Sequence, residues 1–237
     1  MSARVVKMWA NVLLIAGAYL YGSIPFVWGI AHLKGINLRY HGSQNIGCGN
    51  LANAAGVLPG FIGSVCDFSK GVVPLVVGYY WLDADLTILC MASIATLAGQ
   101  MWSVWTGFYD GRGTSISGGL LITFFGLSFI SWKVLLAFIP LFMSIMARNM
   151  RKVKKAPTRI VPLGTLLTFV LIPVLTWLLH EPEVITITFS SVLLLLVIRR
   201  LTADIIDDLR YKAETQRIRD ILINRLLYDR SYLIKYH

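Results

Sequence analysis

The sequence predicts an all-α fold, a polytopic bundle of transmembrane helices with about seven spans. Of the 237 residues, 56% are hydrophobic and only 14% are charged. The mean hydropathy is +0.67, which exceeds the usual balance of a soluble domain, so much of the apolar surface needs lipid as its solvent. Apolar runs recur from residue 9 to residue 198 without a linker rich in Pro or Ser. We therefore expect one transmembrane domain over residues 1–200 and a cytoplasmic tail over residues 201–237.

The predicted spans follow from the length of each apolar run, because a helix needs about 20 apolar residues to cross a bilayer. The run that follows Arg4 and Lys7 is too long for a signal peptide and lacks a small-residue cleavage site, so it predicts a retained first helix. The fourth and fifth runs are short and meet at Trp132, which leaves one long tilted helix or a re-entrant pair as alternatives. In chain order the runs cover residues 9–33, 57–82, 86–105, 118–131, 132–147, 160–179 and 184–198.

The distribution of Lys and Arg predicts the orientation, because basic loops are retained in the cytoplasm. The connections near residues 83–85, Lys133 and residues 180–183 carry little positive charge. An odd number of spans then places the N-terminus outside, although Arg4 and Lys7 oppose that orientation. The basic groups on the predicted cytoplasmic side are Lys34, Arg39, Arg112, the segment 148–159 and the tail from Arg199.

The net charge of +10 indicates an anionic partner. Because the basic residues stand in short clusters beside apolar runs, membrane lipid is the expected partner and nucleic acid is not. The tail is predicted to form a partly amphipathic helix on the inner membrane surface. Its expected apolar stripe consists of Leu201, Ile205, Leu209, Ile218, Leu222 and Leu226.

The first glycine loop, residues 39–50, places small and amide-bearing residues beside an arginine. Alternating Gly with Ser and Asn allows the backbone to take positive φ and to direct several N–H groups at one anion. A tight turn between two helices is the alternative interpretation. The candidate anion-binding residues are Arg39, Gly42, Ser43, Asn45, Gly47 and Asn50.

The second glycine loop, residues 111–114, precedes the fourth apolar run. Gly111, Arg112, Gly113 and Thr114 have the pattern of a phosphate cradle at a helix N-terminus, with a guanidinium that can bind two phosphate oxygens. The spacing is not that of a Walker A loop, since the Lys-Ser/Thr pair is missing. A basic interfacial turn is the alternative interpretation.

Two charged residues, Asp67 and Lys70, fall inside the second apolar run. Charges at membrane depth are unfavourable unless they are paired or face a polar cavity. Three residues apart on a helix, they share one face, so they either pair with each other or contribute to a polar site.

Metal and nucleophile chemistry finds little support in the sequence. Cys48, Cys66 and Cys90 are too widely separated for a zinc site or a disulfide framework and are expected to be free thiols. No Ser-His-Asp set is visible, so we assign no catalytic residue and expect no metal.

Several segments, in this order, resemble motifs of the bacterial acyl-phosphate:glycerol-3-phosphate acyltransferase family. The first glycine loop is similar to the family's Arg-x-x-Gly-Ser-x-Asn-x-Gly-Ala-Thr-Asn, with Cys48 and Gly49 in place of Ala and Thr. The resemblance extends over residues 20 to 165. The remaining matching segments are Gly22-Ser23-Ile24-Pro25, residues 67–71, residues 99–105, residues 111–114 and Thr158-Arg159-Ile160-Val161.

This resemblance implies seven spans, an external N-terminus and an active site on the cytoplasmic side of the bacterial inner cell membrane. The implied reaction transfers a fatty acyl group from acyl-phosphate to the 1-hydroxyl of sn-glycerol 3-phosphate, which gives lysophosphatidic acid for phospholipid synthesis without a cofactor. Ser23, Asp67 and Lys70 join the two glycine loops as implied binding residues. Because an acyl-phosphate is already activated, the protein mainly needs to position two phosphates and stabilise an oxyanion.

The alternative function is that of a non-catalytic membrane relative that binds anionic lipid or a partner. Gln100 stands where the family motif has His, Ser103 where it has Pro, and Arg112 where it has Lys. Residues 201–208 also lack the His and Asn of a family motif that should follow the last span.

Overall fold

The computed structural model describes residues 2–108, 111–150, 160–203, 205 and 218–229. Within these residues every regular element is a helix, so the predicted all-α membrane fold is confirmed. In this described part of the chain, five helical segments are long and apolar enough to cross a membrane: Ala3–Leu33, Val57–Trp81, Leu86–Thr106, Ile160–Leu178 and Glu183–Thr202. The chain divides into two compact units, residues 1–130 and residues 131–237.

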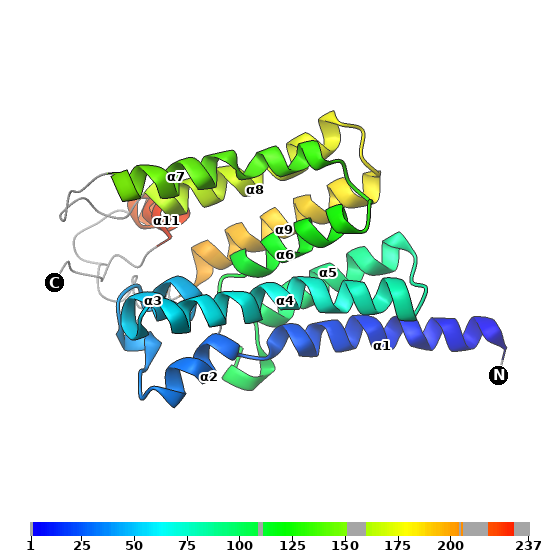
Figure 1. Cartoon of the computed structure of the whole chain (residues 1–237), viewed down its shortest axis with the longest axis horizontal. Helices are drawn as coiled ribbons and strands as arrows, with labels where there is room; N and C mark the ends of the chain where they lie inside the picture. Colours follow the sequence, from blue (N-terminus) through cyan, green and yellow to red (C-terminus); the bar gives the residue numbers. More distant parts are fainter. Residues whose placement is uncertain (1, 109–110, 151–159, 204, 206–217, 230–237) are drawn as a thin grey trace. The chain divides into compact units, whose positions relative to one another are not determined.

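The first unit carries both glycine loops. Helices α1, α4, α5 and α6 form its main body (Figure 1). In order, its elements are α1 (Ala3–Ser23), α2 (Phe26–Leu33), η1 (Leu38–Tyr40), α3 (Cys48–Ala55), α4 (Val57–Trp81), α5 (Leu86–Met101), η2 (Val104–Thr106) and α6 (Thr114–Gly126).

The first predicted span is two helices rather than one. Helix α1 ends at Ser23, and α2 begins at Phe26. Ile24 has extended backbone angles of φ −61° and ψ 117°, as expected for a residue that precedes a proline, where steric contact with the ring disfavours the helical conformation. Pro25 therefore ends the first helix before the first glycine loop.

The fourth predicted span is also displaced. Helix α6 begins at Thr114, four residues before the predicted start at 118, because Gly113 serves as its N-cap. It ends at Gly126, and Ser128 takes a φ of 62°, so the alternative of one long helix through residues 118–147 is wrong. Next come η3 (Trp132–Phe138) and α7 (Ile139–Met150). Both α6 and α7 are shorter than a full crossing, and the count of seven spans stays a prediction.

Glycines allow the helices of the first unit to pack at very short range. A Cβ atom at Gly22 would overlap the carbonyl of Thr96, and one at Gly99 would overlap the carbonyl of Tyr19. Helices α1 and α5 therefore touch through their backbones at two points. In α6, a Cβ at Gly119 would overlap the carbonyl of Phe68 in α4. Lipid provides no hydrophobic drive for helix association, so such close contacts contribute much of the stability of a membrane bundle.

The second unit contains η3, α7, α8 (Ile160–Leu178), α9 (Glu183–Thr202) and α11 (Ile218–Tyr228). The Arg200 guanidinium donates to the carbonyl of Leu226 at 3.0 Å and to that of Pro162 at 3.2 Å. Arg225 donates to the carbonyl of Ala203. These bonds join α11 to α8 and α9. The amphipathic tail and the boundary at residue 200 stay predictions, and Leu209 of the expected stripe lies outside the described residues.

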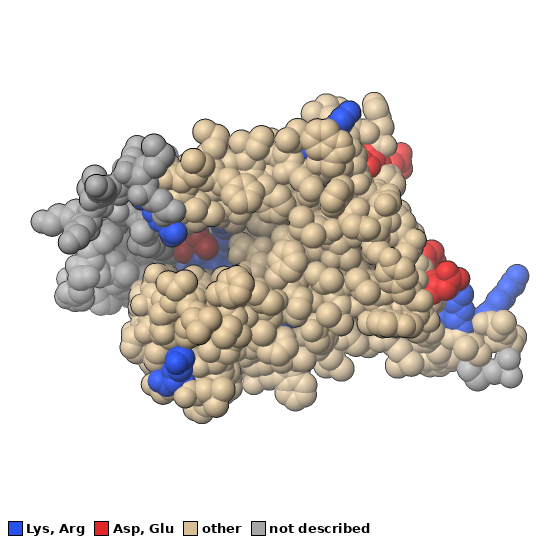
Figure 2. Space-filling view, viewed as in Figure 1, with Lys and Arg blue, Asp and Glu red and all other residues tan. Residues whose placement is uncertain are grey.

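The charge distribution agrees with a membrane environment. On the face shown in Figure 2, the sides of the helices carry almost no Lys, Arg, Asp or Glu, and the charged residues gather near helix ends. Large apolar side chains are exposed along the helices, among them Leu13 at 68% and Phe61 at 64%. Such exposed apolar surface is favourable in contact with lipid.

The close contact between α4 and α6 predicts the effect of a single methyl group. Gly119→Ala should lower the stability of the detergent-solubilised protein by about 1 to 3 kcal/mol, since the Cβ has to displace backbone rather than a side-chain end. Gly126→Ala in the same helix is the matched control, because nothing lies within 4 Å of its Cβ position. Thermal unfolding measures both variants. Equal apparent Tm values would contradict the close packing.

Candidate functional site

The first glycine loop is organised by the buried side chain of Asn50. Its amide nitrogen lies 3.2 Å from the carbonyl of Leu38, 3.0 Å from that of His41 and 3.0 Å from that of Asn45. Its amide oxygen accepts a hydrogen bond from the backbone N–H of Ser43 at 3.1 Å. Both ends of the Asn50 amide are thus engaged with the loop. Its contribution to the site is to hold the loop in shape.

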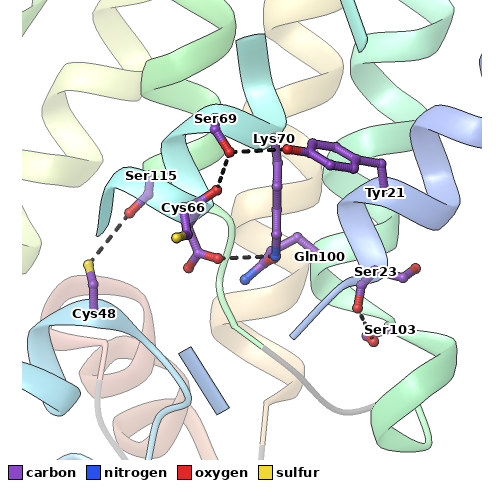
Figure 3. A network of polar contacts seen from close by, with 10 residues as sticks. Tyr21, Ser23, Cys48, Cys66, Ser69, Lys70, Gln100, Ser103 and Ser115 are labelled. Carbon is purple, nitrogen blue, oxygen red and sulfur yellow. Dashed lines mark hydrogen bonds and ion pairs between the residues drawn. The ribbon is translucent and has the colours of Figure 1, made fainter. Parts of the chain in front are cut away.

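The two glycine loops lie against each other, as expected if they serve one site. A Cβ atom at Gly111 would lie only 2.9 Å from the carbonyl oxygen of Ile46. The Cys48 thiol lies 3.6 Å from the Ser115 hydroxyl (Figure 3). The residues that the sequence places far apart therefore meet at one end of the first unit.

Arg39 joins the first glycine loop to the turn before the second. Its guanidinium donates to the carbonyl of Thr106 at 3.5 Å. Arg39 is exposed, whereas Arg112 in the second loop is only 8% exposed. Positive charge is therefore present both at the surface and within the wall of the site.

The loop contact brings two helix N-termini together. Helix α3 begins at Cys48 after Gly47, and α6 begins at Thr114 after Gly113. Neither N-cap supplies a side-chain hydrogen bond to the first turn, so backbone N–H groups are left for another acceptor. Gly113 has a φ of 78°, which glycine adopts without strain. Such N–H groups, together with the helix dipoles, favour the binding of an anion.

Asp67 and Lys70 form a buried ion pair in α4. The Lys70 ammonium lies 3.0 Å from an Asp67 carboxylate oxygen, and the lysine side chain is 0% exposed. It also donates to the side-chain oxygen of Gln100 (Figure 3) and lies 5.2 Å from the centre of the Phe26 ring. The ammonium therefore lies within the protein rather than in an open cavity. Of the two alternatives that the spacing left open, the structure contains the ion pair between Asp67 and Lys70.

Gln100 connects this ion pair to the second glycine loop. Its amide oxygen accepts from Lys70, and its amide nitrogen would lie 2.7 Å from a Cβ placed at Gly111. Sequence reasoning marked Gln100 only as a departure from a motif. The available signal was an amide in an otherwise apolar helix, which in a membrane protein usually has a buried polar partner.

Ser23 lies at the base of the site with its hydroxyl already engaged. That hydroxyl donates to the carbonyl of Tyr19 at 2.9 Å, and the residue is fully buried. Gly42, with a φ of 54°, packs against Asn50, whereas Ser43 and Asn45 are partly exposed. All predicted site residues thus belong to the first unit, and their contacts with a substrate stay predictions. Among the described residues, no group of three His, Cys, Asp or Glu side chains could hold a metal ion.

The fold is that of an integral membrane protein, and the two glycine loops meet at one end of its first unit. A family model for glycerol-3-phosphate acyltransferase matches residues 12–211. The chain belongs to this family, and the expected family is confirmed.

Individual relatives agree with the family match. The chain is 32% identical over 172 residues to a glycerol-3-phosphate acyltransferase of Desulforamulus reducens, which covers 72% of this chain and 78% of the relative. It is 27% identical over 189 residues to one of Prochlorococcus marinus, which covers 79% and 88% respectively. The chain also resembles a crystal structure of PlsY, an integral membrane glycerol 3-phosphate acyltransferase, in its glycerol 3-phosphate form. The two sequences are 25% identical, and the TM-score is 0.68. That similarity covers 88% of this chain and 96% of the crystallised one.

The buried pair predicts a strong asymmetry between single and double substitution. Lys70→Met leaves the Asp67 carboxylate buried without its cation and should cost about 3 to 5 kcal/mol of stability. Lys70→Met combined with Asp67→Asn removes both charges and should recover most of that loss. Thermal unfolding in detergent measures the difference. If the double variant were as unstable as the single one, the charge pair would not be the reason for the loss.

Proposed function

We propose that this protein transfers a fatty acyl group from acyl-phosphate to the 1-hydroxyl of sn-glycerol 3-phosphate and releases lysophosphatidic acid and inorganic phosphate. Family membership supports acyl transfer to glycerol 3-phosphate. The single structural observation that supports the phosphate chemistry is the contact between the two glycine loops, which brings the N-termini of α3 and α6 together.

The proposed reaction needs positioning more than activation. The glycerol hydroxyl oxygen attacks the acyl carbon, a C–O bond forms, and the bond between that carbon and the phosphate oxygen breaks. The departing phosphate can accept the hydroxyl proton, so no side chain has to act as a general base. The protein then has to hold two anionic substrates in contact and stabilise the oxyanion that develops at the acyl carbonyl.

The residues divide into two roles in this proposal. Arg39, Ser43, Asn45 and Arg112 bind phosphate oxygens, while backbone N–H groups at Gly47, Gly111, Gly113 and Thr114 provide further donors. The second role is structural and belongs to Asp67, Lys70 and Asn50, which support the loops without binding phosphate. Their polar groups are engaged inside the protein and hold the loops in place. Lys70 reaches the second glycine loop only through Gln100, which lies beside Gly111.

The proposed location is the bacterial inner membrane, with the N-terminus outside and both glycine loops on the cytoplasmic side. The positive charges of Arg4 and Lys7 near the N-terminus oppose this orientation. They are outnumbered by the run of Arg151, Lys152, Lys154 and Lys155 in a single connection, and the side with more Lys and Arg is retained in the cytoplasm.

Reporter fusions test this orientation. An alkaline phosphatase fusion after Asp85 should be active, since that connection is expected outside, and one after Lys155 should be inactive. Green fluorescent protein fused at the same two positions should give the inverse result. Activity of both phosphatase fusions would contradict the proposed topology.

The phosphate site is tested by comparing two cationic residues. Arg112→Ala should weaken binding of the phosphate substrates by roughly tenfold to a hundredfold, because a guanidinium between two glycines can bind two phosphate oxygens. Lys133→Ala also removes one positive charge from the chain, but Lys133 is exposed and outside both loops. It should leave KM nearly unchanged. Equal effects of the two substitutions would mean that the second glycine loop is only an interfacial turn.

Turnover of palmitoyl-phosphate by the purified protein decides between the enzyme and the non-catalytic alternative. Palmitoyl-CoA serves as the control donor, since its acyl carbon is bonded to a thioester sulfur and not to a phosphate oxygen. Cys48, in the first loop and partly buried, offers an independent binding readout. In a protein with Cys66→Ser and Cys90→Ala, glycerol 3-phosphate should slow alkylation of Cys48. Protection without turnover would favour the alternative function.

A further inference from the structure

One buried hydroxyl fastens the connection between α5 and α6 to the end of α1. Ser103 is 0% exposed. Its hydroxyl donates to the carbonyl of Ser23 at 2.5 Å (Figure 3) and accepts from the N–H of Trp105 at 3.3 Å. The first bond spans 80 residues of sequence. It therefore fixes where the segment that leads to the second glycine loop begins.

The main chain of Ser103 closes the turn that follows. Its carbonyl accepts from the N–H groups of Thr106 at 3.3 Å and Phe108 at 2.8 Å. The carbonyl of Thr106 in turn accepts from the Arg39 guanidinium at 3.5 Å. The Tyr19 hydroxyl provides a second tie to α1 through the carbonyl of Trp102 at 2.8 Å. Ser103 thus lies between two site residues, Ser23 and Arg39, and contacts or supports both.

We propose that Ser103 is a positioning residue that sets the affinity for glycerol 3-phosphate by holding the η2 turn, and with it Arg39, in the binding arrangement. The inference rests on the proposed function. Ser103 is fully buried and acts through the backbone rather than on the substrate. Without its hydroxyl, the turn over residues 103–108 has fewer fixed points, and more of its conformational entropy is lost when the substrate binds.

Kinetics of Ser103→Ala test the proposal against a matched control. The variant should raise KM for glycerol 3-phosphate by about tenfold, with kcat changed by less than about twofold. Ser93→Ala is the control. Ser93 is also 0% exposed and lies in α5, but its hydroxyl bonds to Leu89 of its own helix. Wild-type KM in Ser103→Ala, or an equal change in Ser93→Ala, would overturn the proposal.

A double-mutant cycle separates positioning from a general loss of structure. If Ser103 acts through the η2 turn on Arg39, the effect of Ser103→Ala on KM should be much smaller in an Arg39→Ala protein. Additive effects would overturn the link between the two residues. A wild-type protein without any turnover would instead refute the proposed function, so the two failures are distinguishable.

Ser103→Pro provides a second variant with a different expected result. Ser103 has a φ of −67°, which a proline ring enforces, and its N–H donates no hydrogen bond to the residues that the structure describes. The ring should therefore preserve the turn and return KM to within about threefold of wild type, even without the hydroxyl. A proline variant as impaired as Ser103→Ala would overturn the proposal, since the hydroxyl itself would then be needed rather than the turn that it holds.

Discussion

The burial of a full positive charge at Lys70 is the constraint on which the rest of the site depends. An ammonium removed from water needs a countercharge and hydrogen-bond acceptors, and here Asp67 and Gln100 provide them. Asp67 lies in the same helix, so the pair forms as soon as α4 folds. Gln100 lies in α5, so the lysine also fixes how α4 and α5 meet. The glycines of α6 and α5 then allow their backbones to approach α4 and α1 closely enough to enclose these groups.

The candidate site owes much of its expected affinity for anions to the backbone. Helices α3 and α6 both start from glycine, and both direct the positive ends of their dipoles toward the contact between the loops. Backbone donors are rigid and carry no side-chain entropy, which suits the proposed reaction, in which two phosphates have to be held in a fixed arrangement. They are also insensitive to the identity of most loop residues. This explains how Cys48 and Gly49 can stand where the family motif has Ala and Thr without disturbing the start of α3.

Much of the fold was predictable because membrane spans are long, apolar and local in sequence. For the predicted spans that begin at residues 57, 86, 160 and 184, both ends agree with the structure to within a few residues. The break at Pro25 and the early start of α6 were missed, since hydropathy averages over a proline and over the polar residues Thr114 and Ser115. The two glycine loops were recognised from local patterns. Gln100 and Ser103 were not recognised as partners of Lys70 and Ser23, because those contacts join residues 30 and 80 positions apart.

Helix α11 lies beyond residues 12–211, the part of the chain that the family model matches. Arg200 and Arg225 hold it through main-chain carbonyls of Leu226, Pro162 and Ala203. A carbonyl is present whatever side chain the residue carries. Pro162 and Leu226 can therefore be replaced without loss of these two bonds, whereas Arg200 cannot, and Arg200 also lies 3.9 Å from the carboxylate of Asp229. Such an attachment allows a terminal helix to pack against the bundle before its side chains have become complementary to the surface beneath it. We expect related chains with this extension to keep the two arginines and to vary the residues whose carbonyls accept these hydrogen bonds.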